Sequence, residues 1–365
     1  MAKFQGSIGL VQRVVPSYRL PFFDKLATQC SNGLTLFAGE PLPIESINTS
    51  VQPLVARLVR LRNIHFLDPS KKLYMCYQYG LGQALRIAHP SALIFEANYR
   101  YLASYSAIEW AKNKNIPLVG WGLGAKPLPG GIRQLRNHFL GQFGALVAYS
   151  ETGSEEFAAA GFPRAKILVA KNAATDAPSE SPPTRQVATK PKILFVGRLQ
   201  PRKRVDMLIE VYSTLKDRFG AELVIVGDGP DLPRLQGLAR SLDSDIRFTG
   251  HLEGRALEQE FKQADLFVLP GTGGLAVQQA MSFALPLIVA DGDGTQDDLV
   301  TPSNGWIVKP ADRDDLAKKL GTALQDRGKL VEMGQESYRI VRDEVNIDIM
   351  ANIFIEAIEI AKREK

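Results

Sequence analysis

Basic residues gather directly after an apolar run, at Arg198 and at 202–204. The run, 193–196, predicts a short buried strand that stops at Gly197, and the apolar residues after 204 recur at helical spacing. A strand, a glycine turn and a helix start direct backbone N–H groups and the helix dipole to the place where the cationic side chains lie. Cations at a helix N-terminus oppose its dipole unless an anion binds there, so we predict a phosphate or diphosphate site rather than a solvated basic surface.

Two further glycine turns follow apolar runs in this half of the chain. Gly227–Pro230 follows 223–226, and it is equally consistent with a structural turn and with a ligand contact. The loop 270–275 contains three glycines, whereas a helix cap needs only one, so this loop is predicted to approach a ligand. One turn further on, the amide of Gln278 or of Gln279 is placed to hydrogen-bond a ribose, although glutamine also suits a surface helix.

The elements that must position these residues alternate in type along the chain. Such alternation is typical of a parallel sheet with helices on both faces. The fold class is therefore predicted to be α/β, with two Rossmann-like doubly wound domains facing a central cleft, because ligands bind at the carboxyl ends of such strands. Strands are predicted at 7–15, 34–37, 64–67, 92–95, 117–121 and 145–148, and then at 193–196, 223–226, 246–248, 266–269, 287–290 and 306–308, with helices at 78–88, 101–114, 151–160 and 347–362 among others.

Composition sets the domain plan and the class of protein. At 365 residues the chain is too long for one ordinary core, so we expect an N-terminal domain over 1–174 and a C-terminal domain over 192–345. The segment 175–191 is rich in Pro, Ser and Thr and predicts a linker, and 346–365 predicts a long amphipathic helix.

Charge and cysteine content limit the partners. The net charge of +5 suits anionic small molecules or an anionic membrane, and it is too diffuse to predict a nucleic-acid partner. Two cysteines make neither a disulfide framework nor a metal site, and the N-terminus lacks a signal peptide, so a cytoplasmic protein is expected. In 54–62, Arg57, Arg60 and Arg62 alternate with Leu and Val. This pattern fits a segment lying on an anionic membrane or a helix with one face packed inward.

The C-terminal half resembles a retaining glycosyltransferase of the GT-B fold, similar to glycosyltransferase family 4. The matching stretches are VGRLQPRKRVDMLIEVY, LVIVGDGPDLPRLQGLA, FTGHLE, ADLFVLP, GGLAVQQAMSFALPLIVAD and NGWIVKPADRDDLAKKL, and they arrive in the family's order. The N-terminal half is similar to one branch of that family through QRVVPSYRLPFFDKL, IFEANYRYL, GWGLG and AYSETGSEEFAAAGFPRAKILVAKNAAT.

The resemblance assigns roles to residues of both halves. It implies that Arg198 and Lys203 grip the diphosphate of a nucleotide-sugar donor, that the N-terminal domain binds the acceptor, and that the last helix crosses back to that domain. It further implies that the donor contacts the loop of Gly273, Gly274 and Leu275, with Gly197, Asp228, Gly229 and His251 near the nucleotide.

The chain departs from the family pattern at four positions. The family's two loop glutamates fall on Gly271 and Gln279, and the glycine of its AM-x-x-G-x-P stretch is replaced by Ala284. Where related enzymes carry a histidine near the sugar, this chain has Leu123. A glycine cannot replace a carboxylate, so these changes bear on which sugar is used.

Polar side chains also follow two predicted strands of the N-terminal half, where each strand ends. They predict an acceptor pocket, with helix caps and interdomain salt bridges as an equally supported alternative. Glu96 is the candidate general base for an acceptor hydroxyl. The set comprises Arg13, Tyr18 and Arg19 after the first strand, and Glu96, Asn98 and Arg100 after the later one.

The function predicted from the resemblance is a metal-independent hexosyltransferase. It would move a sugar, with retention, from a nucleotide-sugar such as a UDP- or GDP-sugar to a hydroxyl of a glycan or lipid-linked glycan, with no cofactor. We expect a cytoplasmic enzyme, working at the inner face of a membrane if its acceptor is lipid-linked. The alternatives are a non-catalytic sugar-nucleotide or glycan-binding protein and a nucleotide-sugar epimerase of similar fold.

Overall fold

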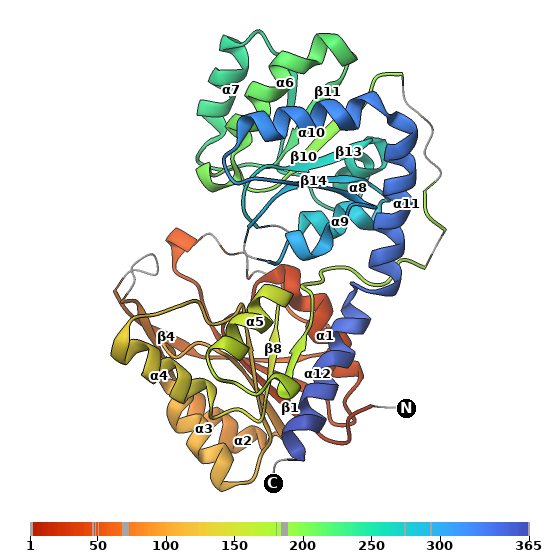
Figure 1. Ribbon diagram of the computed structural model, residues 1–365. Helices are drawn as coiled ribbons and strands as arrows, with labels where there is room; N and C mark the ends of the chain where they lie inside the picture. The colour runs from red at the N-terminus through yellow and green to blue at the C-terminus, as the bar shows by residue number, and fades with distance from the viewer. Residues whose placement is uncertain are drawn as a thin grey trace. The chain divides into compact units, whose positions relative to one another are not determined.

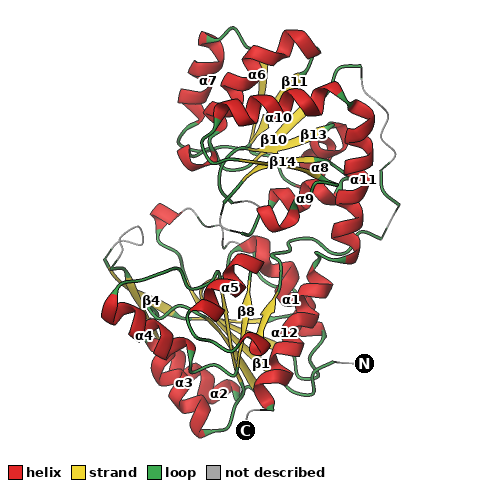
Figure 2. Ribbon diagram, in the orientation of Figure 1, coloured by secondary structure: helices red, strands yellow, loops and turns green. Residues whose placement is uncertain are grey.

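The computed structural model describes residues 3–45, 47, 49, 51–67, 73–179, 181–183, 189–273, 275–292 and 294–363. The chain divides into two compact units, Met1–Asp176 with Ile347–Lys365 and Ala177–Asn346. Each unit contains a parallel sheet with helices packed around it, which confirms the predicted α/β class (Figure 1, Figure 2). In the segment expected as a linker, the described residues lie in no helix or strand.

The first unit is built on a seven-stranded parallel sheet whose order is β3-β2-β1-β6-β7-β8-β9. Its central strands are continuous apolar runs that are buried on both faces, as a covered parallel sheet requires. The strands are β1 (Ile8–Val14), β2 (Leu34–Gly39), β3 (Arg57–Arg60), β6 (Ala92–Glu96), β7 (Leu118–Gly122), β8 (Ala145–Ala148) and β9 (Ile167–Val169). The helices are α1 (Leu20–Thr28), α2 (Leu81–Ala88), α3 (Ala103–Asn113), α4 (Gly130–Leu140) and α5 (Glu151–Ala159).

The last helix, α12 (Ile347–Lys362), also belongs to the first unit, where it packs against α1 and the β7–β8 region (Figure 1). The apolar stripe of α12 carries Phe354, whose ring centroid lies 5.1 Å from that of Phe22 and 5.0 Å from that of Trp121. These three fully buried rings fill the space between helix and sheet. Aromatic packing of this kind is what holds the C-terminal segment to the N-terminal half of the chain.

The second unit is built on a six-stranded parallel sheet with the order β12-β11-β10-β13-β14-β15. Every strand lies where the sequence predicts one. The strands are β10 (Lys192–Val196), β11 (Glu222–Val226), β12 (Ile246–Gly250), β13 (Leu266–Leu269), β14 (Leu287–Ala290) and β15 (Gly305–Val308). The helices are α6 (Val205–Phe219), α7 (Leu232–Ser241), α8 (Gly254–Gln263), α9 (Ala276–Ser282), α10 (Arg313–Gln325) and α11 (Arg327–Asp343).

Both sheets reverse their strand order beside their first strand. In the first unit β1 pairs with β2 on one side and β6 on the other, and in the second unit β10 pairs with β11 and β13. Ligands of doubly wound sheets bind at the carboxyl ends of the strands at this reversal. The fold therefore places a candidate site in each unit: one near the ends of β1 and β6, and one near the ends of β10 and β13.

The segment 54–67 corrects two predictions. Of the two alternatives given for 54–62, the helix is wrong, because Arg57–Arg60 forms the edge strand β3, which pairs in parallel with β2. The strand predicted at 64–67 does not join the parallel sheet. It is instead part of β4 (Arg62–Phe66), which pairs antiparallel with β5 (Met75–Tyr79) in a separate two-stranded sheet. The three-residue spacing of Arg57 and Arg60 is compatible with a helix, but the pairing of this stretch with β2 makes it a strand.

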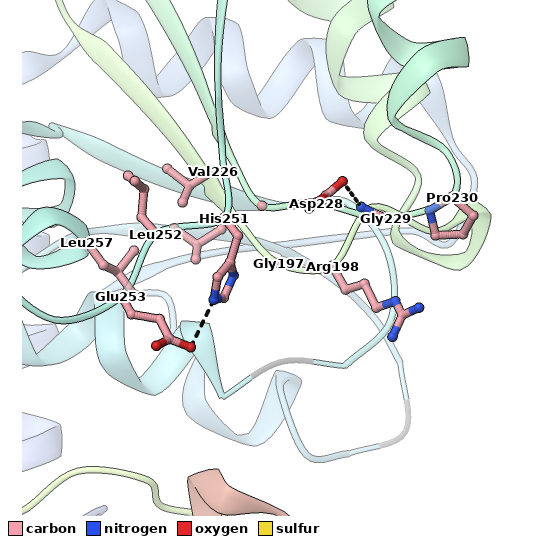
Figure 3. Close-up of a pocket in the computed structure, with 12 residues that line it drawn as sticks. Gly197, Arg198, Val226, Asp228, Gly229, Pro230, His251, Leu252, Glu253 and Leu257 are labelled. Atoms are coloured by element: carbon pink, nitrogen blue, oxygen red, sulfur yellow. Dashed lines mark hydrogen bonds and ion pairs between the residues drawn. The ribbon is translucent and has the colours of Figure 1, made fainter. Parts of the chain in front are cut away.

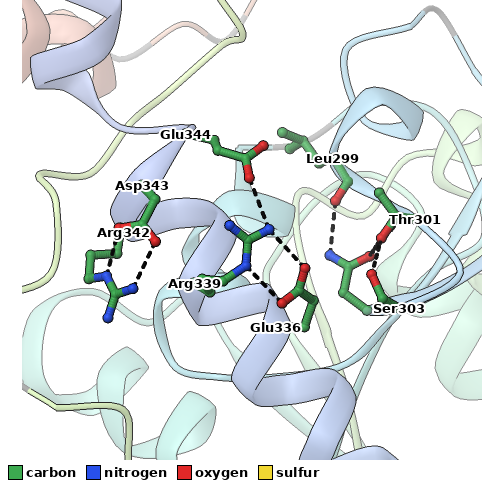
Figure 4. Close-up of polar contacts among 9 residues, drawn as sticks. Leu299, Thr301, Ser303, Glu336, Arg339, Arg342, Asp343 and Glu344 are labelled. Atoms are coloured by element: carbon green, nitrogen blue, oxygen red, sulfur yellow. Dashed lines mark hydrogen bonds and ion pairs between the residues drawn. The ribbon is translucent and has the colours of Figure 1, made fainter.

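Ion pairs gather near the C-terminal end of α11, the last helix of the second unit (Figure 4). The Arg339 guanidinium lies 2.9 Å from both the Glu336 and the Glu344 carboxylates, and Arg342 pairs with Asp343 at 2.7 Å. These side chains are largely in contact with water, so each pair contributes little to stability. Their position shows where α11 ends before α12 begins.

No helix in the described part of the chain combines the length and apolar character needed to cross a bilayer.

Candidate functional site

A pocket of about 650 Å³ lies at the carboxyl ends of β10 and β11 (Figure 3). It is formed by the turns that follow these strands together with the segment after β12. The pocket brings together five residues that the sequence assigned to the donor: Gly197, Arg198, Asp228, Gly229 and His251. The Arg198 side chain is exposed and extends from its turn on the side of Gly229 (Figure 3).

The two glycine turns of the pocket pack backbone against backbone. A Cβ on Gly227 would lie 2.0 Å from the Gly197 carbonyl oxygen, and one on Gly229 would lie 2.2 Å from that of Leu199. The Leu199 N–H donates to the Asp228 carbonyl at 2.9 Å, which fixes the approach. Gly227 and Gly229 are therefore required by the structure itself, and the surface that they form together leaves Arg198 facing the pocket.

Lys203 links this pocket to the loop 270–273. It lies in the 3₁₀ turn Pro201–Lys203, is only 6% exposed, and donates from Nζ to the Gly273 carbonyl. Its Cε lies 3.9 Å from where a Cβ on Gly197 would be. The basic residues thus occupy a turn that precedes α6, and Arg204, with φ of +52°, is the cap of that helix rather than part of it. An ammonium has three donors, so Lys203 can bind this carbonyl and an anion together.

The loop after β13 is packed too tightly for the glutamate that the resemblance places there. A Cβ on Gly271 would lie 2.3 Å from the Arg202 carbonyl oxygen and 2.4 Å from the Lys203 carbonyl carbon. The Thr272 N–H donates to the Arg202 carbonyl at 3.1 Å and holds the two segments together. The glycine at 271 therefore allows the turn that carries Lys203 to pack this closely, and a glutamate at 271 would clash with that turn.

Gln296 is a buried residue that sequence analysis missed. Its Oε1 accepts from the Gly273 N–H at 2.5 Å, and its Nε2 donates to the Gly271 carbonyl at 3.0 Å and to the Ala290 carbonyl. The side chain is fully buried. Gln296 thus ties the glycine loop to the end of β14. No spacing or motif in the sequence marks a lone glutamine for this role.

Replacing Gln296 with alanine is expected to lower the free energy of unfolding by about 2–4 kcal/mol, because it leaves buried N–H and C=O groups of the loop without partners. The affinity for a nucleotide-sugar should fall with it, since Gly273 is no longer held beside Lys203. Urea unfolding measures the first effect, with the exposed Gln325→Ala in α10 as the control. An unfolding midpoint equal to that of the wild type would show that the loop does not depend on Gln296.

The remaining predicted donor residues lie outside the pocket. Gln279 is half-buried on α9 and Leu275 precedes that helix, and neither is among the described residues that line the pocket. Gln278 is fully buried and donates to the Val345 carbonyl at 3.0 Å, so its role is structural. Gly274 lies outside the described residues. The ribose contact of Gln279 stays a prediction.

The structure also gives the surroundings of His251 and of Ala284. His251 is exposed, and its Nε2 lies 2.9 Å from Glu253 Oε1 across the mouth of the pocket (Figure 3). Ala284 has φ of +54°, a conformation that glycine adopts without strain, which explains why a glycine is usual at this position. Among the described residues, no group of three or more His, Cys, Asp or Glu side chains is arranged to hold a metal ion.

The first unit has its own pocket, of about 590 Å³, at the carboxyl ends of β6, β7 and β8. Glu96, Asn98 and Arg100 line it, together with Leu123 and a stacked pair that was not predicted, Trp121 and Tyr149. Trp121 is fully buried, so within this pair it supports the Tyr149 ring from behind. Of the two predicted polar sets, the one after β6 therefore lines a concave surface.

Arg13, Tyr18 and Arg19 are not among the described residues that line this pocket. The Arg13 guanidinium makes a two-pronged ion pair with Glu45, at 2.9 and 2.5 Å. The Arg19 guanidinium lies 4.7 Å from the Trp121 ring centre, so it contacts a residue of the pocket wall. The alternative to an acceptor pocket is a salt bridge between domains. Arg13 does form a salt bridge, but its partner Glu45 lies in the same unit.

Glu96 lies at the end of β6 in surroundings that change its acidity. Burial raises the pKa of its carboxyl above the usual value, while the nearby Arg13 charge and a hydrogen bond from Tyr101 act in the opposite direction. The pKa of the Tyr101 hydroxyl is itself raised, by burial and by the charge of Glu96. A carboxylate with a raised pKa is a stronger proton acceptor than an ordinary one. Glu96 therefore has the chemistry that a general base requires.

Comparison with known proteins connects these features to a family. Residues 176–340 match the family Glycosyl transferases group 1. The chain is similar to the sulfoquinovosyl transferase of Arabidopsis thaliana (34% identity over 146 residues, covering 38% of this chain and 27% of that protein). It is also similar to the GDP-mannose-dependent monoacylated alpha-(1-6)-phosphatidylinositol monomannoside mannosyltransferase of Corynebacterium glutamicum (31% identity, covering 44% of this chain and 45% of that protein). The matched regions thus span less than half of either relative.

A solved structure extends the likeness to the whole chain at the level of fold. The crystal structure of Anabaena HepE in complex with UDP superposes with a TM-score of 0.76 and 16% identity, covering 97% of this chain and 99% of that one. The two doubly wound units are therefore a GT-B fold. The predicted resemblance to GT-B glycosyltransferases is confirmed, whereas its narrower placement in family 4 stays a prediction.

Proposed function

We propose that this chain transfers a hexose from a nucleotide-sugar to a hydroxyl of a glycan or lipid-linked glycan, with retention of the anomeric configuration and without a metal ion. One observation carries the proposal: Arg198 lines a glycine-walled pocket at the carboxyl ends of β10 and β11, and Lys203 lies next to Gly197 of the pocket wall. A nucleoside diphosphate fits a site with these properties, because it needs close backbone approach and positive charge at the same place.

The chemistry requires charge neutralisation on the leaving group. The bond between the anomeric carbon and the donor phosphate oxygen breaks, the bond to the acceptor oxygen forms, and the acceptor hydroxyl gives its proton to the candidate base Glu96. Arg198 and Lys203 stabilise the negative charge that collects on the departing diphosphate, which is the role that a divalent ion fills elsewhere. The anomeric carbon passes through an oxocarbenium-like state, as in other glycosyl transfers.

The relatives support this assignment by their own activities. One uses GDP-mannose, one transfers sulfoquinovose, and the structural neighbour binds UDP. We infer from them that the donor is a nucleotide-sugar and that the acceptor is of the glycan or glycolipid class. Incubation with UDP- and GDP-sugars, with and without a glycan acceptor, tests the proposal. Sugar transfer that requires the acceptor supports it, and conversion of the donor to another sugar nucleotide without acceptor would identify an epimerase instead.

The missing loop glutamate favours one second candidate, a sugar-nucleotide-binding protein without catalysis, because Gly271 offers no carboxylate toward the sugar. This candidate predicts donor binding without transfer or hydrolysis. Single-turnover analysis of bound donor separates the two, because a catalyst releases free nucleoside diphosphate from it and a binding protein does not.

Glu96→Gln is expected to lower kcat by about 100-fold, since the acceptor hydroxyl loses its proton acceptor. The pH profile carries the sharper prediction. A base must be deprotonated, and the pKa of Glu96 is raised, so wild-type activity is present at high pH and is lost as pH falls through a value above the usual carboxylate range. In Glu96→Gln this acid limb should disappear. The exposed Glu155→Gln on α5 is the matched control, and an unchanged profile in Glu96→Gln would assign the base elsewhere.

A further inference from the structure

The two-stranded sheet β4–β5 exposes its apolar face. In its antiparallel register Arg62 faces Tyr79, Ile64 faces Tyr77 and Phe66 faces Met75. The apolar and aromatic members of these pairs are between 37% and 65% exposed. A two-stranded sheet on a protein surface normally turns its apolar side chains inward and its polar ones to water. Here the arrangement is reversed, so the outer face has the composition of a contact surface.

Hydrogen bonds on the inner face of the same sheet fix which side chains point outward. It carries polar side chains that bond to backbone at the ends of β1 and β2. The Asn63 amide donates to the Arg13 and Glu40 carbonyls at 2.8 and 3.0 Å, and the buried Gln78 amide donates to the Gln12 carbonyl at 2.9 Å. A slip of one residue would turn Ile64 and Tyr77 inward and break these bonds. The exposed apolar face is therefore a specified feature of the fold.

Three arginines lie beside this face. Arg57 and Arg60 on the edge strand β3 and Arg62 on β4 line a hollow of about 410 Å³, together with Tyr79 and Ile87. All three arginines are exposed, and Arg60 also pairs with Glu40. Among the described residues that line this hollow there is no carboxylate. The surface thus combines exposed apolar and aromatic side chains with a cluster of positive charge.

We propose that the outer face of β4–β5 and the arginines of β3 dock this protein on an anionic phospholipid bilayer. The arginines would contact headgroup phosphates, and Ile64, Phe66 and Tyr77 would enter the interfacial region. Basic side chains beside exposed apolar and aromatic ones are the combination that anionic membranes bind, since each part alone gives weak attachment. A protein partner for the arginine cluster would have to bring its own carboxylates, whereas an anionic bilayer supplies phosphates over its whole surface.

The position of this face suits a lipid-linked acceptor, a point that rests on the proposed function. Beside β5, in the plane of the sheet, the backbone pairs with the chain that lines the first unit's pocket: the Cys76 N–H donates to the Arg100 carbonyl at 3.0 Å, and the Leu102 N–H donates to the Cys76 carbonyl at 2.8 Å. Arg100 and Tyr101 of the pocket therefore lie directly beside the strand that carries Tyr77 of the proposed membrane contact. An acceptor held in a bilayer would reach that pocket over a short path.

Vesicle co-sedimentation tests the docking without donor or acceptor, so its outcome is independent of catalysis. The full chain is mixed with vesicles of phosphatidylcholine alone or with a quarter phosphatidylglycerol. One variant carries Ile64→Ser, Phe66→Ser and Tyr77→Ser, and another carries Arg57→Gln, Arg60→Gln and Arg62→Gln. The matched control carries Lys112→Gln, Lys114→Gln and Arg240→Gln, three exposed bases on other surfaces. Thermal unfolding confirms that each variant is folded.

The proposal predicts that the wild type and the control sediment with anionic vesicles and much less with neutral ones. The arginine variant should bind anionic vesicles about 100-fold more weakly. The serine variant should bind at least about 10-fold more weakly. Equal sedimentation with both vesicle types, no sedimentation at all, or wild-type binding by folded variants would overturn it. A wild-type dimer that the serine variant converts to a monomer would show that the face binds a second copy instead.

Discussion

Arg198→Ala and Lys203→Met are each expected to lower kcat/KM for sugar transfer by about 10²–10³-fold, because each removes a cation from the leaving diphosphate. The two substitutions should differ in their effect on stability. Arg198 is exposed, so its loss should leave the unfolding midpoint unchanged. Lys203 is buried and binds the Gly273 carbonyl, and methionine keeps most of its stem packing while removing the charge.

Arg202→Gln provides the control for this pair. Arg202 lies on the same turn, and its guanidinium is directed to the Gln200 side chain and the Thr272 carbonyl, at 3.1 and 3.3 Å. Arg202→Gln should lower kcat/KM by less than about 10-fold, because the Arg202 guanidinium is exposed and is bonded to protein groups. Initial rates over a range of donor concentrations measure all three. If Arg202→Gln were as damaging as the others, general positive charge rather than two placed cations would explain the site.

Gly271→Glu, which restores the residue usual in the resembled family, is expected to damage this protein rather than improve it. The added side chain would begin 2.3 Å from the Arg202 carbonyl oxygen, so the turn that carries Lys203 must move. We expect the free energy of unfolding to fall by about 3 kcal/mol or more. Donor turnover should fall to the level of Lys203→Met or below, because Lys203 loses its position.

The matched control is Gly237→Glu on α7, where nothing lies within 4 Å of the added Cβ. This control changes charge and size in the same way, and it should lower the free energy of unfolding by about 1 kcal/mol or less. Differential scanning calorimetry and donor turnover are measured on both variants. A Gly271→Glu protein that is as stable as the wild type and more active would mean that the loop adapts and that the carboxylate was the missing group.

The strands of the second unit are predicted well because each one corresponds to a short apolar run that is visible in the local sequence. β10, β11, β13 and β14 are uniform apolar runs between glycine turns and helices, and such runs have few alternatives to a buried parallel strand. The segment 54–79 is predicted poorly for a reason that the structure makes plain. In β4 and β5, Ile64 and Tyr77 face outward whereas Gln78 is buried, so the pattern that identifies a buried face gives the wrong answer there.

Site residues divide in a similar way. Arg198 and Asp228 follow apolar strands directly, and strand ends are predictable, so their meeting in one pocket could be inferred. Gln296 and the Trp121–Tyr149 stack depend on contacts between segments far apart in sequence, which no local pattern encodes. The tight packing at Gly271 belongs to the same class. From the sequence it is only an absent glutamate, and the structure supplies the steric reason.

Phosphate recognition by Arg198 and Lys203 is tested most directly by calorimetric titration of a nucleoside and its diphosphate. The base is whichever of UDP, GDP and ADP raises the melting temperature of the wild type most. Wild-type protein should bind the diphosphate at least about 100-fold more tightly than the nucleoside. In a protein carrying both Arg198→Ala and Lys203→Met, that ratio should fall below about 10-fold while nucleoside affinity stays the same. An unchanged ratio in the folded double variant would contradict the assignment of these two residues to the diphosphate.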